Sequence, residues 1–172
     1  MTRRQLLHRV GFVVGRTMVG LEVQQVMALR AFLASLEEID AQRIAVLGVE
    51  QGGMTAFYAA AVDEAFAGAV IVDYFQRRED CWKEPVDRML YGQLRTFGDA
   101  EVAALIAPRR LAALFQPSGP VDSKAADAEG KRARRFYGGL GLADRLNVVR
   151  SERALLSILL RTLNGVRIAC KC

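Results

Sequence analysis

The chain has 172 residues, of which 52% are hydrophobic, and its formal net charge is +5. This length and composition fit one globular domain that buries roughly 70% of its unfolded surface, which excludes a disordered chain. The basic run over 131–135 lacks interleaved stacking aromatics, so we expect a solvated face and no nucleic-acid partner. No apolar run approaches the ~18 residues of a membrane span, so we expect no membrane partner.

The cysteines are three in number: Cys81, Cys170 and Cys172. Their odd count, without metal-ligand spacing beyond the terminal C-x-C, predicts reduced thiols in a cytoplasmic protein. We expect neither a metal ion nor a cofactor.

The expected elements alternate between helices and strands along the chain. Residues 1–18 are interpreted as an N-terminal extension, and apolar positions with a 3.6-residue period predict an amphipathic helix over 20–38. Residues 43–47 are short, aliphatic and followed by glycine, as in a buried strand. Small apolar residues over 53–62 predict a helix packed closely on a sheet, and 67–72 resembles a second buried strand.

The second half of the chain continues this alternation. Residues 75–98 are charged, aromatic and irregular, which predicts a lid-like or loop segment, and Asp99 is expected to cap the helix that follows. The tail over 165–172 fits no recognisable motif. The remaining expected elements are a helix over 100–107, a strand over 111–115, a helix over 123–137, a strand over 146–149 and a helix over 152–163.

This order predicts an α/β fold: a three-layer α/β/α domain with a mostly parallel sheet, spanning 1–172 as a single domain. Parallel sheets place their chemistry at the carboxyl ends of the strands. The candidate site therefore consists of the residues that follow the strands: 48–52, 73–75, 116–122 and 150–153.

One of these turns has the spacing of a nucleophile elbow. The stretch IAVLGVEQGG, over 44–53, places Gly48 and Gly52 around a central position as in G-x-S-x-G. Glu50 stands at that central position, where such a turn carries its nucleophilic serine.

The chain resembles a known family over residues 15–150. The phrases GRTMVGLEVQQVMALRAFL, RIAVLGVEQGGMTAFYAAAVDEAFAGAVIVDYF and FGDAEVAALIAPRRL, in this order, are similar to the α/β-hydrolase domains of bacterial proteins of the dienelactone hydrolase and acetyl xylan esterase type. The resemblance implies that the four strands are the second half of that fold's sheet. The early strands have no counterpart, so we expect a truncated or divergent half-domain.

The resemblance also implies roles for individual residues. Glu50 takes the place of the nucleophile, and the N–H of Gln51 would donate to an oxyanion. Asp122 takes the position of the catalytic acid, with Asp73 as a second candidate; the alternative for Asp122 is a turn aspartate that caps the next helix. The catalytic histidine should follow the last strand, but the only histidine of the chain is His8, which we expect on the surface.

These residues favour an esterase-type domain whose catalysis is impaired or lost. The first alternative is an active hydrolase of short acyl esters, in which Glu50 replaces serine and an ester intermediate forms on its carboxylate. A second is a non-catalytic binding or interaction module. A third is a dinucleotide-binding domain, which is disfavoured because G-x-G-x-x-G is absent.

Two partners are expected. A small ester ligand would occupy the cleft at the strand ends. A second copy of the chain, or another chain, would cover the sheet edge that the missing strands leave exposed.

Overall fold

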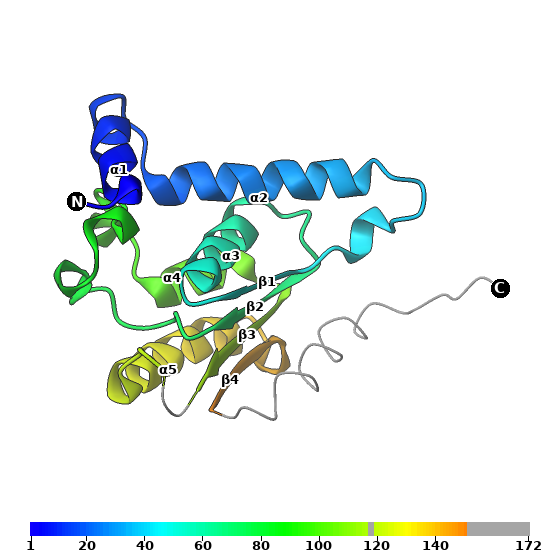
Figure 1. The fold of residues 1–172 in the computed structure, drawn as a ribbon. Coiled ribbons are helices and arrows are strands. Elements are labelled where there is room, and N and C mark those ends of the chain that lie inside the picture. Colours follow the sequence, from blue (N-terminus) through cyan, green and yellow to red (C-terminus); the bar gives the residue numbers. More distant parts are fainter. Residues whose placement is uncertain (117–118, 151–172) are drawn as a thin grey trace.

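A computed structural model describes residues 1–116 and 119–150. Its centre is a four-stranded sheet in the order β1-β2-β3-β4, in which every neighbouring pair is parallel (Figure 1). The predicted α/β class is thereby confirmed. The strands are β1 (Val46–Val49), β2 (Gly68–Val72), β3 (Arg110–Phe115) and β4 (Leu146–Arg150).

The strands begin close to their predicted positions, with one shift. β1 starts at Val46, three residues after the predicted start at 43, because residues 41–43 form a turn of 3₁₀ helix. Asp40 caps this turn by accepting a hydrogen bond from the Gln42 N–H. β2 is buried along its whole length, as expected for a strand with a neighbour on each side.

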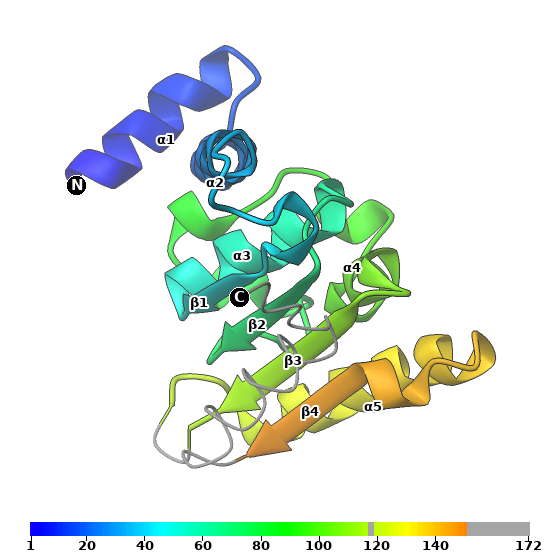
Figure 2. The same ribbon diagram turned by 90° about the vertical axis from the view of Figure 1, so that its right-hand side faces the viewer.

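Three helices connect the strands and lie together on one face of the sheet (Figures 1 and 2). Each crossover moves to the next strand in the same direction, so the right-handed rule places all of them on the same side. The helix predicted over 152–163 lies outside the described residues. The connecting helices are α3 (Gln51–Val62), α4 (Asp99–Ile106) and α5 (Ser123–Gly139).

Two further helices precede the sheet. α2 (Met18–Ala34) packs along the outer side of α3, and Figure 2 shows it end-on above that helix. α1 (Arg3–Val13) falls within the expected N-terminal extension, where no helix was predicted. Its start is marked in the sequence by a capping box, in which Thr2 and Gln5 each bond to the other's backbone N–H.

The main core lies between the sheet and α3–α5. Phe57 and Phe75 are fully buried there with their rings edge-to-face, and Tyr74 lies beside Phe57. The aromatic start of the 75–98 segment is thus anchored in the core. The rest of this segment is irregular, as predicted, with short 3₁₀ turns at Cys81–Lys83, Val86–Arg88 and Gln93–Arg95.

Arg109, directly before β3, contacts the C-terminus of α3. Its Nη1 donates to the carbonyl oxygens of Ala60 at 2.7 Å and of Asp63 at 3.0 Å, so the guanidinium caps the C-terminus of α3. A cation at this helix end also compensates the partial negative charge of the last carbonyls.

We expect Arg109→Met to lower the free energy of unfolding by about 2 kcal/mol, because half-buried carbonyls lose charge-assisted hydrogen bonds. Arg110→Met is the matched control, since the hydrogen bond from Arg110 to the Asp144 carbonyl is exposed, and it should cost under about 1 kcal/mol. Urea unfolding followed by circular dichroism measures both. Equal losses in the two variants would contradict the capping role.

Within 1–116 and 119–150, no helix combines the length and apolar character needed to span a bilayer.

Candidate functional site

The turn after β1 has the backbone of a nucleophile elbow. Glu50 adopts φ 50° and ψ −110°, a strained conformation for a residue with a side chain. Its N–H donates to the Val72 carbonyl of β2 at 2.8 Å, and its own carbonyl accepts from the Met54 N–H in α3. These two hydrogen bonds fix the backbone of Glu50, and its side chain therefore lies at the end of β1.

Two glycines make this turn sterically feasible. A Cβ on Gly48 would lie 1.9 Å from the Gly52 carbonyl oxygen, so β1 and the start of α3 approach too closely for any side chain there. A Cβ on Gly53 would lie 2.9 Å from the Val72 carbonyl oxygen. Gly52 is different, because a Cβ there would meet nothing within 4 Å.

The structure brings the predicted strand-end residues into one row. Val49 aligns with Val72, Val72 with Leu114, and Phe115 with Arg150, so the four carboxyl ends form one edge of the sheet. Glu50, Asp73, Gln116 and Arg150 follow or end these strands. The sheet thus brings the predicted strand-end residues to one edge. The chemistry possible at this edge depends on the contacts of their side chains.

Asp73 links two of the strand-end loops. It has φ 56° and is almost fully buried. Its Oδ1 accepts from the Gln116 N–H at 2.8 Å and its Oδ2 accepts from the Gln116 side-chain amide at 2.7 Å. Gly119 also lies against this carboxylate, because a Cβ there would be 2.5 Å from Oδ1. Asp73 therefore has a structural role that explains its conformation.

Asp122 caps α5. Its Oδ1 accepts a hydrogen bond from the Ala125 N–H at 2.8 Å, and its backbone is extended as in an N-cap. The alternative that the sequence left open, a helix-capping aspartate, matches this geometry. The position that the resemblance assigns to a catalytic acid thus holds a carboxylate already engaged by the backbone.

Glu50 and Gln51 differ in their surroundings. Glu50 is exposed, and its side chain makes no hydrogen bond within the described part of the chain. Gln51 is the first residue of α3, where a helix leaves its N–H groups without intrahelical partners, as an oxyanion donor requires. Its side-chain amide donates to Glu22 of α2 at 3.1 Å.

Glu22 was missed by sequence reasoning. Its carboxylate also accepts from Thr55 Oγ1 at 3.2 Å and is paired with Arg4 of α1. Burial acts to raise the pKa of Glu22, but the hydrogen bonds from Arg4, Gln51 and Thr55 outweigh it and hold the pKa below its ordinary value. The signal for this cluster is tertiary, because its members come from α1, α2 and α3.

His8 is fully buried, so the expected surface position is wrong. Its Nε2 lies 2.6 Å from the Tyr91 hydroxyl, and the two rings pack with centroids 5.5 Å apart. The reason is that α1 docks onto the 75–98 segment and places this face of the helix inside. His8 is thus held by Tyr91 and α1 rather than at a strand end.

A second group of ionisable residues lies buried under the 75–98 segment. Arg78 is only 2% exposed; its Nη1 donates to Glu84 at 2.7 Å and its Nε is 3.8 Å from Asp99. Asp99 is the first residue of α4 rather than its N-cap, which is Gly98; its carboxylate instead accepts from the Gln76 N–H at 3.1 Å.

Burial raises the pKa of Asp99 to about 7, and the nearby Glu129 and Glu84 carboxylates act in the same direction. Arg78 and the Gln76 N–H oppose this shift but do not cancel it. Asp99 is therefore a carboxyl group that holds its proton up to neutral pH.

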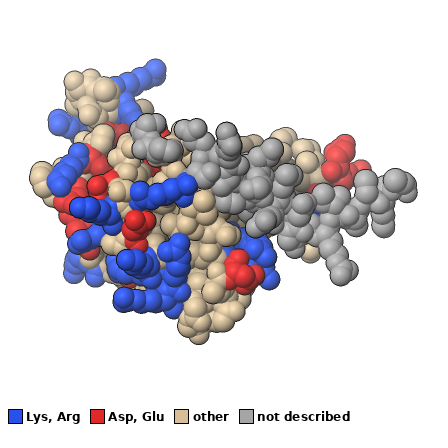
Figure 3. Space-filling model, turned by 90° about the horizontal axis from the view of Figure 1, so that it is seen from below, with Lys and Arg blue, Asp and Glu red and all other residues tan. Residues whose placement is uncertain are grey.

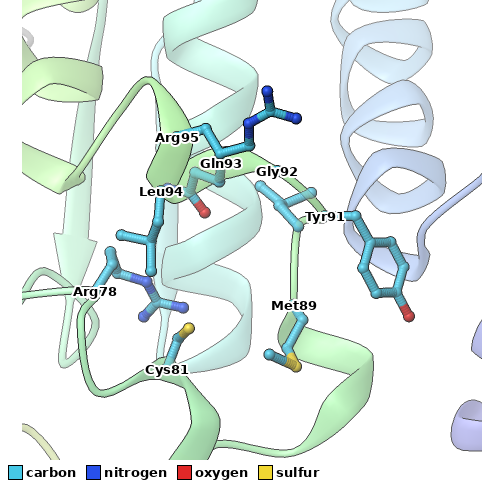
Figure 4. A pocket seen from close by; sticks show the side chains of 9 residues that line it. Arg78, Cys81, Met89, Tyr91, Gly92, Gln93, Leu94 and Arg95 are labelled. Atoms are coloured by element: carbon cyan, nitrogen blue, oxygen red, sulfur yellow. The ribbon is translucent and has the colours of Figure 1, made fainter.

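A pocket of about 370 Å³ opens beside Arg78 (Figure 4). Met89, Leu90 and Leu94 give it apolar walls, while the Arg78 and Cys81 side chains lie close together at one side. Tyr91 points away from this space toward α1. A different groove, of about 390 Å³, lies beside the elbow on the outer side of β1, where Gln51 and Gly52 line it.

No group of three or more His, Cys, Asp or Glu within 1–116 and 119–150 is arranged to hold a metal ion.

Lys and Arg side chains gather at the end of the molecule where α5 lies, with acidic side chains between them (Figure 3). Arg132 pairs with Glu129 and Glu101 there, and Arg150 pairs with Asp127. The expectation of a solvated face at 131–135 stays a prediction.

Comparisons with solved structures find a similar fold in several esterases. A glucuronoyl esterase from Solibacter usitatus superimposes with a TM-score of 0.64 at 15% identity, over 81% of this chain and 46% of that one. A protein from Bacteroides fragilis NCTC 9343 assigned as an acetyl xylan esterase gives 0.68 at 17%, over 87% and 40%. The glucuronoyl esterase catalytic domain from Hypocrea jecorina gives 0.67 at 16%, over 83% and 51%.

The chain has an α/β-hydrolase-type fold. At these identities the likeness shows the fold alone, and the chain spans about half the length of these structures or less. No protein-family model matches the sequence, and no curated protein matches it.

Proposed function

We propose that this chain is an esterase-type α/β-hydrolase domain that no longer carries out serine-triad catalysis. The observation that supports this most strongly is the elbow itself: its strained backbone is retained, while Glu50 stands at its tip. Hydrolysis through a covalent intermediate needs a nucleophile and a base that then activates water. The single histidine of the chain is buried against Tyr91, which leaves no imidazole for the elbow.

Both candidates for the acid of a triad are compromised in the same way. Asp122 accepts from the Ala125 N–H, and Asp73 accepts twice from Gln116. β4 ends at Arg150, whose guanidinium pairs with Asp127 of α5. These contacts give Asp73, Asp122 and Arg150 partners within the fold. We further propose that the chain corresponds to the second half of a larger esterase domain, as the resemblance of its four strands implies; it aligns over 46% of the Solibacter usitatus enzyme.

The oxyanion side of the site is better preserved. Gln51 stands at the N-terminus of α3, and its backbone N–H is suited to an ester carbonyl or a carboxylate. This supports retained binding of a small acyl ligand at the strand ends without its turnover. Glu50 acting as a carboxylate nucleophile is the alternative that the elbow geometry favours, because the side chain is exposed and without a hydrogen bond in the described residues.

Hydrolysis of 4-nitrophenyl acetate by the native chain, Glu50→Gln and Glu50→Ser tests the proposal. We expect all three to stay within about twofold of the buffer rate, because serine at the elbow still lacks a base. Cooperative unfolding of each variant is the control for folding. If the native chain hydrolyses the ester about tenfold or more faster than Glu50→Gln does, Glu50 is instead the nucleophile.

A further inference from the structure

The outer edge of β1 has no strand beside it in the described part of the chain. β1 pairs with β2 on one side only. Leu47 and Val49 are 45% and 46% exposed, which is unusual for aliphatic residues of a strand in a parallel sheet. An uncovered edge of this kind is a template for pairing with another strand.

The backbone groups of this edge follow from the hydrogen bonds of the turn. The Glu50 N–H points toward β2, where it meets the Val72 carbonyl. N–H and C=O groups of successive strand residues alternate in direction, so those of Leu47 and Val49 point to the free edge. Their side chains lie on the face opposite α3, since Val46 packs into the core on the α3 side.

α2 leaves this edge accessible. The groove of about 390 Å³ beside β1 is bordered by Val26 and Leu29 of α2 and by Val46 and Leu47 of β1. Leu29 is itself 57% exposed. A strand laid along the edge would therefore find apolar surface next to its backbone partners.

The charges at the two ends of β1 indicate which strand fits. Arg43 precedes the strand, and its Nε is buried without a hydrogen-bond partner in the described residues. Glu50 follows the strand directly; it is exposed, and its side chain has no hydrogen-bond partner in the described residues. An antiparallel copy of the same segment brings the acidic end of one strand beside the basic end of the other, twice.

We propose that two copies of this chain join by antiparallel pairing of β1 across a two-fold axis at Leu47. In this register Leu47 lies opposite Leu47 of the second copy and Val49 opposite Ala45, so the edge-directed backbone groups meet and the apolar side chains share one face. Glu50 lies opposite Ile44, one residue from Arg43. The interface is isologous, and the two sheets become one. This inference does not depend on the proposed function.

Charge reversal tests the pairing, with sedimentation equilibrium as the measurement. Glu50→Arg alone places two like-charged pairs in the dimer, and so does Arg43→Glu alone. We expect each to weaken dimerisation about tenfold or more, as close like charges do at an interface. A 1:1 mixture of the two variants should dimerise about as tightly as the native chain, because both Arg–Glu pairs are then restored in the heterodimer.

Two exposed positions provide charge-matched controls. Glu37→Arg and Arg135→Glu change the net charge by the same amounts. Glu37 lies beyond the end of α2 and Arg135 on α5, both outside the proposed strand pair, so both variants should dimerise like the native chain. Far-ultraviolet circular dichroism and cooperative melting show that each variant is folded. A monomeric native chain, or a mixture that dimerises no better than its components, would overturn the proposal.

Discussion

Replacing Gly48 with alanine should lower the free energy of unfolding by at least about 3 kcal/mol, the largest loss that we expect from a single methyl group in this chain. The added Cβ would lie 1.9 Å from the Gly52 carbonyl oxygen, 2.2 Å from its carbon and 2.6 Å from the Gly53 nitrogen. All three are backbone atoms at the start of α3, so no side-chain rotation relieves the contact. The turn must open or α3 must move away from β1.

Gly52→Ala is the matched control four residues away. Its Cβ would meet nothing within 4 Å, and alanine is the better helix former by about 0.5–1 kcal/mol, so this variant should be neutral or slightly stabilised. Urea unfolding of both variants measures the difference. Similar stabilities would mean that β1 and α3 do not approach each other this closely in solution.

Asp99→Asn should stabilise the protein relative to the native chain, and increasingly so as the pH rises from 5 to 8. The native Asp99 carboxyl has its pKa raised to about 7 by burial, from an ordinary value of 3.8. Between these values the folded chain binds a proton that the unfolded chain releases, so native stability falls as the pH rises. Asparagine does not titrate, and its amide oxygen still accepts from the Gln76 N–H.

We expect the stability difference between Asp99→Asn and the native chain to grow by roughly 2 to 3 kcal/mol between pH 5 and pH 8. Denaturant unfolding at constant ionic strength measures it. Asp80→Asn is the control, because it removes a carboxylate of the same region that is exposed in the fold. Parallel pH profiles for Asp99→Asn and the native chain would show that Asp99 is ionised in the fold and balanced by Arg78.

The sequence predicts the close approach at Gly48 better than it predicts the burial of Asp99. The G-x-x-x-G spacing of Gly48 and Gly52 predicted the elbow, because a strand that turns directly into a packed helix needs a close approach at a fixed offset. It did not distinguish the two glycines, although only Gly48 lies against backbone. Asp99 was expected to cap α4, since a capping signal is local, whereas its burial beside Arg78 depends on how the 75–98 segment folds back.

Apart from α1, which it did not predict, the sequence by itself determined the order of the described strands and helices, the parallel sheet and the row of strand-end residues. These follow from local periodicity and from the rule that short crossovers join parallel neighbours, so each can be inferred from adjacent residues. Only the tertiary structure decided that His8 is buried against Tyr91, that Glu22 joins α1, α2 and α3, and that Asp73 is held by Gln116. The physical reason is that these contacts link residues 18 to 83 positions apart, and their energies depend on burial and charge that no local pattern encodes.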